Sequence, residues 1–293
     1  MLVVSNSKIQ NWQRCRKAWE FAWIKDLELK RKKETLETGT IVHGLLQKYY
    51  KGELDLQAEA SQLQFDDDPG NIEAKASGIA FLLVSRYVKD FAPFEDAGYK
   101  VVATEYYFQV PLRTKNGIDF MLEGYCDLLV IDEHGYLWLW DHKTTSRFWT
   151  PLQVMMDAQT PTYAAALRTL DKPIHGIIFN QLNTYEYKNY LDVPPEKLFK
   201  RERTYRTPVE LDAFLSNLYD IVDDMVENQH HITRSLNKDC AYCFFQNPCL
   251  LEMKGVDIKD TLEADYQKRK PRPFEIGKEA NKEWRESQLT KMI

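Results

Sequence analysis

Apolar residues recur at helical spacing through the first third of the chain, and this rhythm predicts three helices. Residues 5–24 carry three tryptophans and an isoleucine at such spacing, after Ser5 or Ser7 as the N-terminal cap. The same rhythm predicts helices over residues 40–50 and 71–91. The segment up to about residue 95 is therefore expected to be mainly helical.

The rhythm then changes to that of β-strands. Residues 99–110, 119–131 and 136–143 are rich in Val, Leu and aromatic residues, and glycine-containing turns separate them. A helix is predicted over residues 157–170 and a further strand over residues 174–181. Three consecutive strands followed by a helix and another strand indicate a central sheet.

A third pattern marks the start of a long helix near residue 207. Thr207 is a capping residue, Pro208 suits the first turn, and Glu210 stands where a capping box needs an acid. The whole order is helices, strands, a helix, a strand and a helix. It predicts an α/β or α+β fold, which does not have to be doubly wound.

Composition fits a folded protein of one large domain. The chain has 293 residues, of which 44% are hydrophobic and 13% aromatic, so it can build a substantial core. No apolar run approaches the roughly 18 residues that cross a bilayer, and the first residues do not resemble a secretion signal. We therefore expect a soluble, cytoplasmic protein without a membrane partner.

The net charge of −5 does not by itself suggest a nucleic-acid binder, but charge is unevenly distributed. Basic residues gather at 30–33, 197–206 and 268–272, and acidic residues at 66–68. Each basic run is either a solvated face or a contact for nucleic acid. A metal-dependent nuclease must also concentrate carboxylates, so mild acidity does not exclude DNA.

Two carboxylates lie within apolar strands. Asp127 follows Gly124-Tyr-Cys, and Asp141 begins the run Asp141-His142-Lys143. An unpaired buried carboxylate costs several kcal/mol, so a cation should accompany these residues. Strand alternation places Asp141 and Lys143 on one face and His142 on the other.

These residue types suit phosphodiester hydrolysis. Oxygen ligands hold Mg²⁺ or Mn²⁺, which activates water and neutralises charge on the phosphate, and a nearby lysine orients the water or stabilises the phosphate. The alternative is a structural Asp–Lys pair at a strand end, the usual meaning of an isolated Asp-x-Lys triplet. The preceding Gly-x-x-Asp strand favours the active-site interpretation.

In these residues the chain resembles the PD-(D/E)XK nucleases, and in particular their RecB-type branch, which includes CRISPR-associated and phage exonucleases. Further segments resemble that branch in the same order along the chain: Ser5-x-Ser7-x-Ile9-x-x-Trp12-x-x-Cys15, Gly39-x-x-x-His43, Glu105, and Gln159-x-x-x-Tyr163. The resemblance covers most of residues 5–250 and implies a restriction-endonuclease-like mixed sheet flanked by helices.

The resemblance also implies roles for individual residues. His43, Asp127, Asp141 and the backbone carbonyl of His142 would be metal ligands, and Glu105 a nearby acid. Lys143 would act on the water or the phosphate. Gln159 and Tyr163 would contact DNA and support the site. Taken singly, His43 could be an ordinary helix histidine, Glu105 a surface residue and Tyr163 part of the core.

Five cysteines occur, and three of them, Cys240, Cys243 and Cys249, fall within ten residues. With Cys15 as a fourth ligand they suit either zinc or a 4Fe–4S cluster. In the iron–sulfur members of the RecB-type branch, one N-terminal cysteine joins three C-terminal ones in this way. The resemblance therefore favours the 4Fe–4S cluster over zinc, and Cys126 is expected to be a packed thiol.

The resemblance implies a DNA exonuclease acting on single-stranded DNA or duplex ends, in phage or bacterial recombination, repair or CRISPR-related processing. Alternatives are an endonuclease with the same site, an inactive DNA-binding subunit and an electron-transfer protein. No ATPase motif is present, because Gly39 to Gly44 lacks the lysine of a phosphate-binding loop, so a helicase partner would be a separate chain.

The expected organisation is a nuclease domain over residues 1–256 and a charged tail over residues 257–293. Within the nuclease domain we expect a helical segment at about 5–95, a core at about 99–190, and a final helix with the cysteine cluster at about 207–250.

Overall fold

The computed structural model describes residues 2–31, 33–63 and 71–269. The chain divides into two compact units. One, which we call the sheet unit, comprises Lys32–Val110 and Glu123–Ser216. The other, the terminal unit, comprises Met1–Arg31, Pro111–Leu122 and Asn217–Ile293. The predicted acidic run at residues 66–68 and the end of the basic run at 268–272 lie outside the described residues.

A mixed β-sheet forms the centre of the sheet unit. The strands are β3 (Lys100–Arg113), β4 (Asp119–Ile131), β5 (Leu137–Thr145), β6 (Gly176–Asn183) and β7 (Phe199–Thr204). The end of β3 and the start of β4 belong to the terminal unit. The order of the strands is β4-β5-β6-β7, and β3 also pairs with β4. β5 and β6 are parallel, whereas β4–β5 and β6–β7 are antiparallel. The predicted α/β fold with a central mixed sheet is confirmed.

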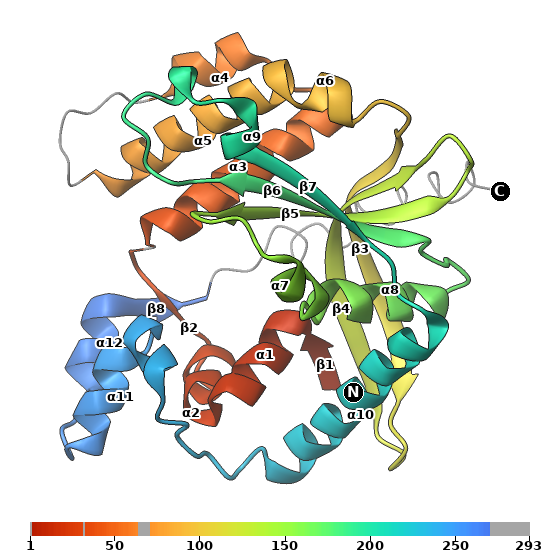
Figure 1. Cartoon of the computed structure of the whole chain (residues 1–293). Coiled ribbons are helices and arrows are strands. Elements are labelled where there is room, and N and C mark those ends of the chain that lie inside the picture. Colours follow the sequence, from red (N-terminus) through yellow and green to blue (C-terminus); the bar gives the residue numbers. More distant parts are fainter. Residues whose placement is uncertain (1, 32, 64–70, 270–293) are drawn as a thin grey trace. The chain divides into compact units, whose positions relative to one another are not determined.

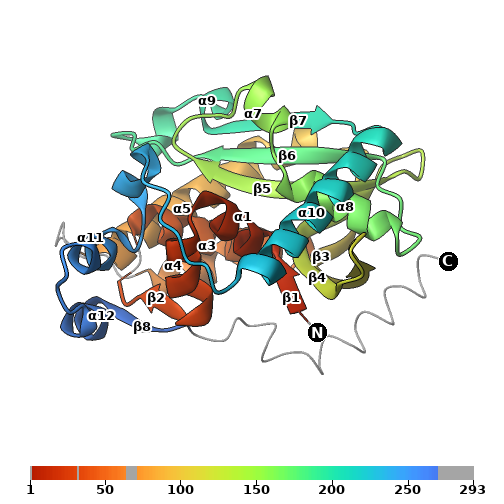
Figure 2. The ribbon, with the colours of Figure 1, turned by 90° about the horizontal axis from the view of Figure 1, so that it is seen from below.

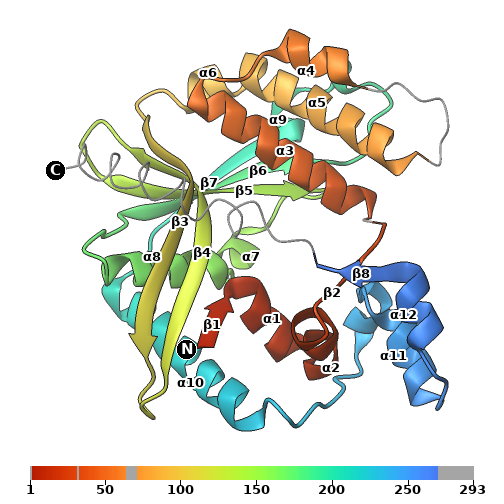
Figure 3. The ribbon, with the colours of Figure 1, turned by 180° about the vertical axis from the view of Figure 1, so that it is seen from behind.

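Helices flank this sheet on both faces (Figures 1 and 3). The helices of the sheet unit are α3 (Glu34–Lys51), α4 (Leu56–Gln62), α5 (Ile72–Asp90), α6 (Ala92–Glu95), α7 (Pro151–Met155), α8 (Gln159–Arg168) and α9 (Pro195–Leu198). Helix α10 (Pro208–Asn228) begins in this unit and ends in the other. Helices α3 and α5 lie on one face, and α7 and α8, which connect β5 to the parallel strand β6, lie on the other.

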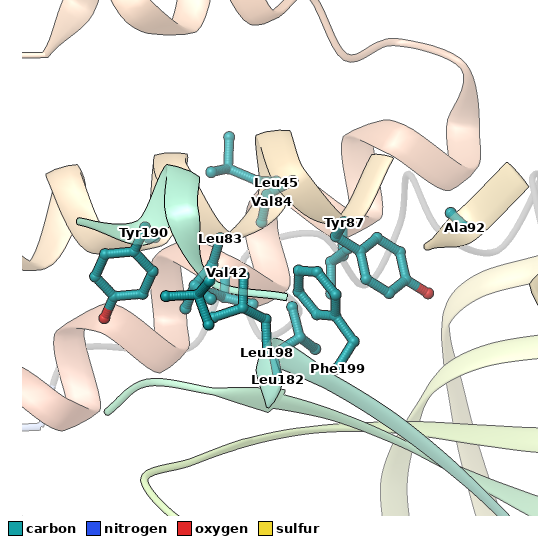
Figure 4. Close-up of a cluster of buried hydrophobic side chains, with 13 residues drawn as sticks. Val42, Leu45, Leu83, Val84, Tyr87, Ala92, Leu182, Tyr190, Leu198 and Phe199 are labelled. Atoms are coloured by element: carbon teal, nitrogen blue, oxygen red, sulfur yellow. The ribbon is translucent and has the colours of Figure 1, made fainter. Parts of the chain in front are cut away.

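A buried apolar cluster in the sheet unit joins α3 and α5 to β6 and β7 (Figure 4). Val42 and Leu46 from α3 and Leu83 from α5 are fully buried there. They pack with Leu182 and Phe199 from the strands. Because each buried side chain of this kind contributes about 1.5–3 kcal/mol, this cluster fixes α3 against the sheet.

The terminal unit brings the two ends of the described chain together (Figure 2). Its elements are β1 (Leu2–Ser5), α1 (Asn6–Arg14), α2 (Arg16–Trp19), a π-helical segment (Glu20–Ile24), β2 (Leu27–Leu29), α11 (Gln246–Met253), α12 (Lys259–Asp265) and β8 (Tyr266–Lys268). Strand β2 pairs with β8, so that Leu27 lies opposite Lys268. The rings of Phe21, Phe245 and Tyr266 stack in the core beneath them.

Several elements differ from their predicted form. The first predicted helix is broken at Cys15, whose extended backbone (φ −168°, ψ 116°) separates α1 from α2. Helix α3 starts at Glu34 rather than near residue 40, because its polar first turn carries no apolar rhythm. Residues 259–268, within the predicted tail, form α12 and β8, held by pairing with β2 that local sequence does not reveal.

Most of the basic run at 197–206 lies in β7 (Phe199–Thr204). Lys197 and Arg203 are exposed, whereas the Arg201 side chain is only 1% exposed. Arg201 donates hydrogen bonds to Asp96 and to the hydroxyl of Tyr87, and its guanidinium lies 4.0 Å from the centre of the Trp140 ring. No helix in the described part of the chain is both long and apolar enough to cross a membrane.

Gly124 marks a place where β4 leaves no room for a side chain. A Cβ atom there would lie 2.7 Å from ring atoms of both Phe108 and Tyr163. We therefore expect Gly124→Ala to destabilise the protein by about 1–3 kcal/mol through overpacking. Gly44→Ala, in α3, is the matched control, because nothing lies within 4 Å of its Cβ position. Helix propensity makes that change neutral or stabilising by up to about 1 kcal/mol.

Urea denaturation of the three proteins measures both effects. Equal stability of Gly124→Ala and the unmodified protein would contradict the close packing of α8 on β4.

Candidate active site

The candidate site forms where β4 and β5 stop pairing. Their register runs from Ile131–Leu137 to Leu128–Trp140. Asp127 and Asp141 come directly after the last pair. The backbone N–H of His142 donates a 2.7 Å hydrogen bond to Asp127 Oδ2 instead of to a neighbouring strand. The end of the ladder therefore turns one carboxylate toward the backbone of the other strand.

Helix α3 crosses this opening. Gly39 is needed there, because a Cβ would lie 2.9 Å from Thr144 Oγ1 on β5. One turn later, His43 places Nδ1 3.6 Å from Asp127 Oδ2. Two turns after His43, the ring of Tyr50 stacks on the ring of His142 at 5.7 Å. Gly39, His43 and Tyr50, which are four and seven residues apart, thus lie on one face of α3. Along this face the contacts with β5 run from Thr144 to His142.

Glu105 completes a three-residue group. His43, Glu105 and Asp127 each offer one ligand atom, and these atoms lie within 4.8 Å of one another. Glu105 sits in β3 with φ at +47°, a left-handed conformation that costs a non-glycine residue about 1–3 kcal/mol. Such strain tends to persist where the side-chain position matters. Among the described residues this is the one group of three or more His, Cys, Asp or Glu with ligand atoms so close.

The electrostatics of the group reflect its crowding. Burial would lower the pKa of His43, but the facing Asp127 carboxylate raises it to about 9. Burial would raise the pKa of Asp127, yet His43 and the His142 N–H lower it to about 2. Burial, together with repulsion from Asp127, raises the pKa of Glu105 to about 7. A nitrogen ligand and two crowded carboxylates suit a divalent cation.

Asp141 and Lys143 form an ion pair beside this group. Lys143 Nζ lies 2.8 Å from Asp141 Oδ2 and 3.4 Å from Gln159 Oε1. Burial raises the pKa of Asp141 to about 6, against the opposing effect of Lys143. Burial would lower the pKa of Lys143, but Asp141 and Asp157 raise it above its ordinary value. The lysine therefore carries a positive charge in this setting.

His142 points to the opposite face of β5. Its ring is fully buried, and its Nδ1 accepts a 3.0 Å hydrogen bond from the Asn180 amide. Burial lowers its pKa to about 3, so the ring is neutral. The side chain is thus a packed residue, and the backbone of position 142 is the part that faces Asp127.

Tyr163 and Gln159 lie on α8 beneath the site. The Tyr163 ring packs edge-to-face on Phe108 at 4.9 Å and covers Gly124. Burial raises the pKa of its hydroxyl, which Gln159 contacts. Gln159 therefore connects the Tyr163 hydroxyl to Lys143.

The structure brings the predicted residues together in two adjoining sets. The first set is His43, Glu105 and Asp127, and the second is Asp141, Lys143, Gln159 and Tyr163. Glu105, which could have been an ordinary surface residue, belongs to the first set. Asp141, which was predicted to bind the metal together with His43 and Asp127, forms an ion pair with Lys143 in the second set.

Sequence reasoning missed Asp157 and Trp149. Asp157 accepts hydrogen bonds from the backbone and hydroxyl of Thr160 at the start of α8, and it acts electrostatically on Lys143. The Trp149 ring centre lies 5.5 Å from Lys143 Nζ. Asp157 could have been found, because an aspartate before Gln-Thr-Pro is a typical capping residue at a helix start. Trp149 lies in an irregular segment that carries no such sequence signal.

The predicted cysteine ligands lie together in the terminal unit. Cys15, Cys240, Cys243 and Cys249 line one cavity of about 80 Å³. Arg14, Lys17 and Arg234 line the same cavity. No three of the four sulfur atoms lie within 4.8 Å of one another. Cys126 is instead a buried thiol in β4, as expected.

Comparison with known proteins gives one family and several distant structural likenesses, among them the following two. A family model described as the PD-(D/E)XK nuclease superfamily matches residues 3–250. The crystal structure of SSO0001 covers 84% of this chain and 85% of its own, with 13% identity and a TM-score of 0.40. A candidate exonuclease from Eubacterium rectale covers 81% of this chain and 86% of its own, with 14% identity and a TM-score of 0.45. A search of curated proteins finds no match.

The raised pKa of Glu105 generates a stability prediction. Because the folded protein holds this proton more tightly than the unfolded chain does, stability falls as the pH rises from about 4.5 to about 7, and the full cost is present above pH 7. At pH 8 in chelating buffer, Glu105→Gln should therefore melt about 2–4 °C above the unmodified protein. With Mn²⁺ the order should reverse, because the variant has lost a carboxylate charge beside the ion and gains less from it.

Glu196→Gln, at an exposed position in α9, is the control and should follow the unmodified protein in both buffers. Differential scanning calorimetry measures the melting temperatures. An equal rise with Mn²⁺ in Glu105→Gln would exclude Glu105 from the metal site.

Proposed function

Because the chain belongs to the PD-(D/E)XK nuclease superfamily, we propose that it is a metal-dependent deoxyribonuclease that degrades DNA from an end. The observation that carries this proposal is the convergence of His43, Glu105 and Asp127 beside the Asp141–Lys143 ion pair. A nitrogen ligand, crowded carboxylates and a buried lysine are the parts that phosphodiester hydrolysis needs.

The metal ligands in this proposal are His43, Asp127, Asp141 and the His142 carbonyl, with Glu105 beside them. The donor set of oxygens with one histidine fits Mg²⁺ or Mn²⁺. When bound, the ion supplies an activated water and neutralises charge on the phosphate.

The remaining residues act on the phosphate directly. Lys143, kept protonated by Asp141 and Asp157, stabilises the negative charge that develops on the phosphoryl oxygens. Gln159 holds the lysine from below, and Tyr163 fixes the helix that carries Gln159. Misplacement of the lysine by even about 1 Å would cost activity, which gives α8 a positioning role in addition to the DNA contact proposed for Gln159 and Tyr163.

Assignment to the RecB-type branch rests on the ordered segments from Ser5 to Tyr163, and it carries the preference for exonuclease activity. The proposed setting is phage or bacterial DNA recombination, repair or CRISPR-related processing, with a helicase as a separate partner chain. The alternatives are an endonuclease that uses the same site and an inactive DNA-binding subunit. The complete set Asp127, Asp141 and Lys143 favours an active enzyme over the latter.

We further propose that Cys15, Cys240, Cys243 and Cys249 hold a 4Fe–4S cluster. A tetrahedral zinc site with 2.3 Å bonds places its sulfurs about 3.8 Å apart. No three of the four sulfurs here lie within 4.8 Å of one another, and all four cysteines line a cavity of about 80 Å³, which suits a body of several atoms. Arg14, Lys17 and Arg234 would offset the negative charge that four thiolates give a cluster. Its function would be to join the two chain ends.

Asp141→Asn and Lys143→Ala should each lower cleavage at least about 100-fold, because the first removes a charged metal ligand and the second removes the cation that acts on the reacting phosphate. Lys188→Ala, an exposed lysine elsewhere in the sheet unit, should leave cleavage unchanged. The assay uses end-labelled single- and double-stranded DNA, linear and circular, with Mg²⁺ or Mn²⁺. We expect linear DNA to be shortened and circular DNA to remain intact.

Cleavage of circular DNA would contradict the exonuclease proposal and favour an endonuclease that uses the same site. Full activity in either folded variant would remove the proposed active site.

Protein purified without oxygen should be brown and contain about four irons per chain. Cys15→Ser and Cys243→Ser should both lose this iron, because a four-thiolate site cannot be closed without either ligand. Cys126→Ser is the matched control and should keep it, since that thiol lies in β4 of the sheet unit. Iron analysis and absorption spectra provide the measurement. One zinc and no iron would refute the cluster and leave the four-cysteine site in place.

A further inference from the structure

A second cleft in the sheet unit lies next to the candidate active site. It has a volume of about 470 Å³, which is within the range of ligand-binding pockets. Its lining includes Tyr49, Tyr50, Tyr99, Trp140, Lys51 and Asp96. None of these residues belongs to the proposed catalytic or metal-binding set.

Two separate elements connect this cleft to the metal-binding group. On α3, Tyr50 follows His43 by seven residues, so it lies on the same helix face at a distance of about 10 Å along the axis. On β3, Val101 lines the cleft and precedes Glu105 by four residues, or about 13 Å of strand. Measured along these two elements, Tyr50 and Val101 are roughly 10–13 Å from His43 and Glu105.

The walls of the cleft are aromatic and firmly held. The Tyr99 ring lies edge-to-face on Trp140 at 5.6 Å, and its hydroxyl accepts a 3.0 Å hydrogen bond from Arg203. Trp140 is fully buried, and its indole N–H has no hydrogen-bond partner. Tyr50 packs between Trp140 and His142, with its hydroxyl bonded to that of Tyr87. The ring positions are thus preorganised.

Charge at the cleft favours a phosphate-bearing ligand. Lys51 lines the rim at the end of α3, and it acts electrostatically on Glu105. Asp96, the acidic residue of the lining, is paired with the buried Arg201 at 2.9 Å. The open edge therefore carries a cation, while the acid inside is neutralised.

Building on the proposed function, we propose that this cleft binds one nucleobase of the substrate strand, about two nucleotides from the phosphate that is cleaved. The partly exposed rings of Tyr49, Tyr50 and Tyr99 can stack any base, and a basic rim follows the backbone. A separation of roughly 10–13 Å corresponds to about two steps of an extended strand, which rises roughly twice the 3.4 Å per step of duplex DNA. A base can enter such a cleft only when it is unpaired, so the substrate is single-stranded at this point.

Binding of short oligonucleotides with one abasic position at a time tests the proposal. A fluorescent single-stranded DNA is bound in Ca²⁺ buffer, and its anisotropy is followed. In the unmodified protein, an abasic residue at the position about two nucleotides from the cleavage point should weaken binding about 5- to 100-fold. In Tyr99→Ala the intact DNA should bind more weakly, and the abasic residue should cost little more.

Two further variants separate stacking from a structural effect. Tyr99→Phe keeps the ring and should retain the abasic penalty, although it loses the hydrogen bond from Arg203. Tyr185→Ala, an exposed tyrosine outside the cleft, should behave as the unmodified protein. The fluorescence of 2-aminopurine at the sensitive position should be quenched on binding by the unmodified protein and by Tyr99→Phe, but not by Tyr99→Ala.

The outcomes distinguish this inference from the proposed function. Cleavage of DNA with equal tolerance of an abasic residue at every position would overturn the subsite and leave the nuclease in place. An unchanged abasic penalty in Tyr99→Ala would do the same. Position-dependent binding without any cleavage would support the subsite and remove the enzymatic activity. Absence of DNA binding would remove both.

Discussion

The end of the β4–β5 ladder is the constraint on which the site depends. Once Leu128 and Trp140 have paired, the His142 N–H still needs a partner, because a buried, unpaired amide costs about 1–3 kcal/mol. Asp127 supplies it at 2.7 Å and is thereby held at one edge of the opening. Helix α3 can then bring His43 to the same carboxylate only because Gly39 permits close contact with Thr144. The distance between the proposed ligands is therefore set by regular strands and a helix, and not by a loop.

Buried charge in this region is balanced within two neighbouring sets rather than across the whole site. His43 offsets Asp127, and Lys143 offsets Asp141, so Glu105 is the carboxylate that is left crowded and strained. On the other face of the sheet, Arg201 is held by Asp96, Tyr87 and Trp140. The residues of β5 therefore alternate between a hydrolytic face and an aromatic face. Helix α3 carries His43 and Tyr50 on one face, and both rings contact the ring of His142, so the aromatic side chains of β5 lie next to the proposed metal ligands.

Much of the architecture could be predicted from the sequence because local patterns determine it. The strands containing Asp127 and Asp141, the helix of Tyr163 and the start of α10 follow from apolar rhythm and capping residues. Non-local pairing could not be predicted in the same way. Residues 259–268 become ordered through β2, and the break at Cys15 depends on its surroundings in the terminal unit. The left-handed backbone of Glu105 and the burial of Arg201 likewise arise from tertiary contacts that no local rhythm encodes.

The pairing of β2 with β8 has a consequence for biosynthesis. Leu27 is synthesised early, whereas its partner Lys268 is synthesised only after the whole intervening chain. At about 5–20 residues per second, the N-terminal segment waits roughly 10–50 s for that partner. During this interval the sheet unit, whose segments lie entirely between the two, can complete its own core. During this time Phe21 and its neighbours lack their C-terminal packing partners. The period in which they are exposed to aggregation or chaperone binding therefore depends on the rate of translation and not on the folding rate of the sheet.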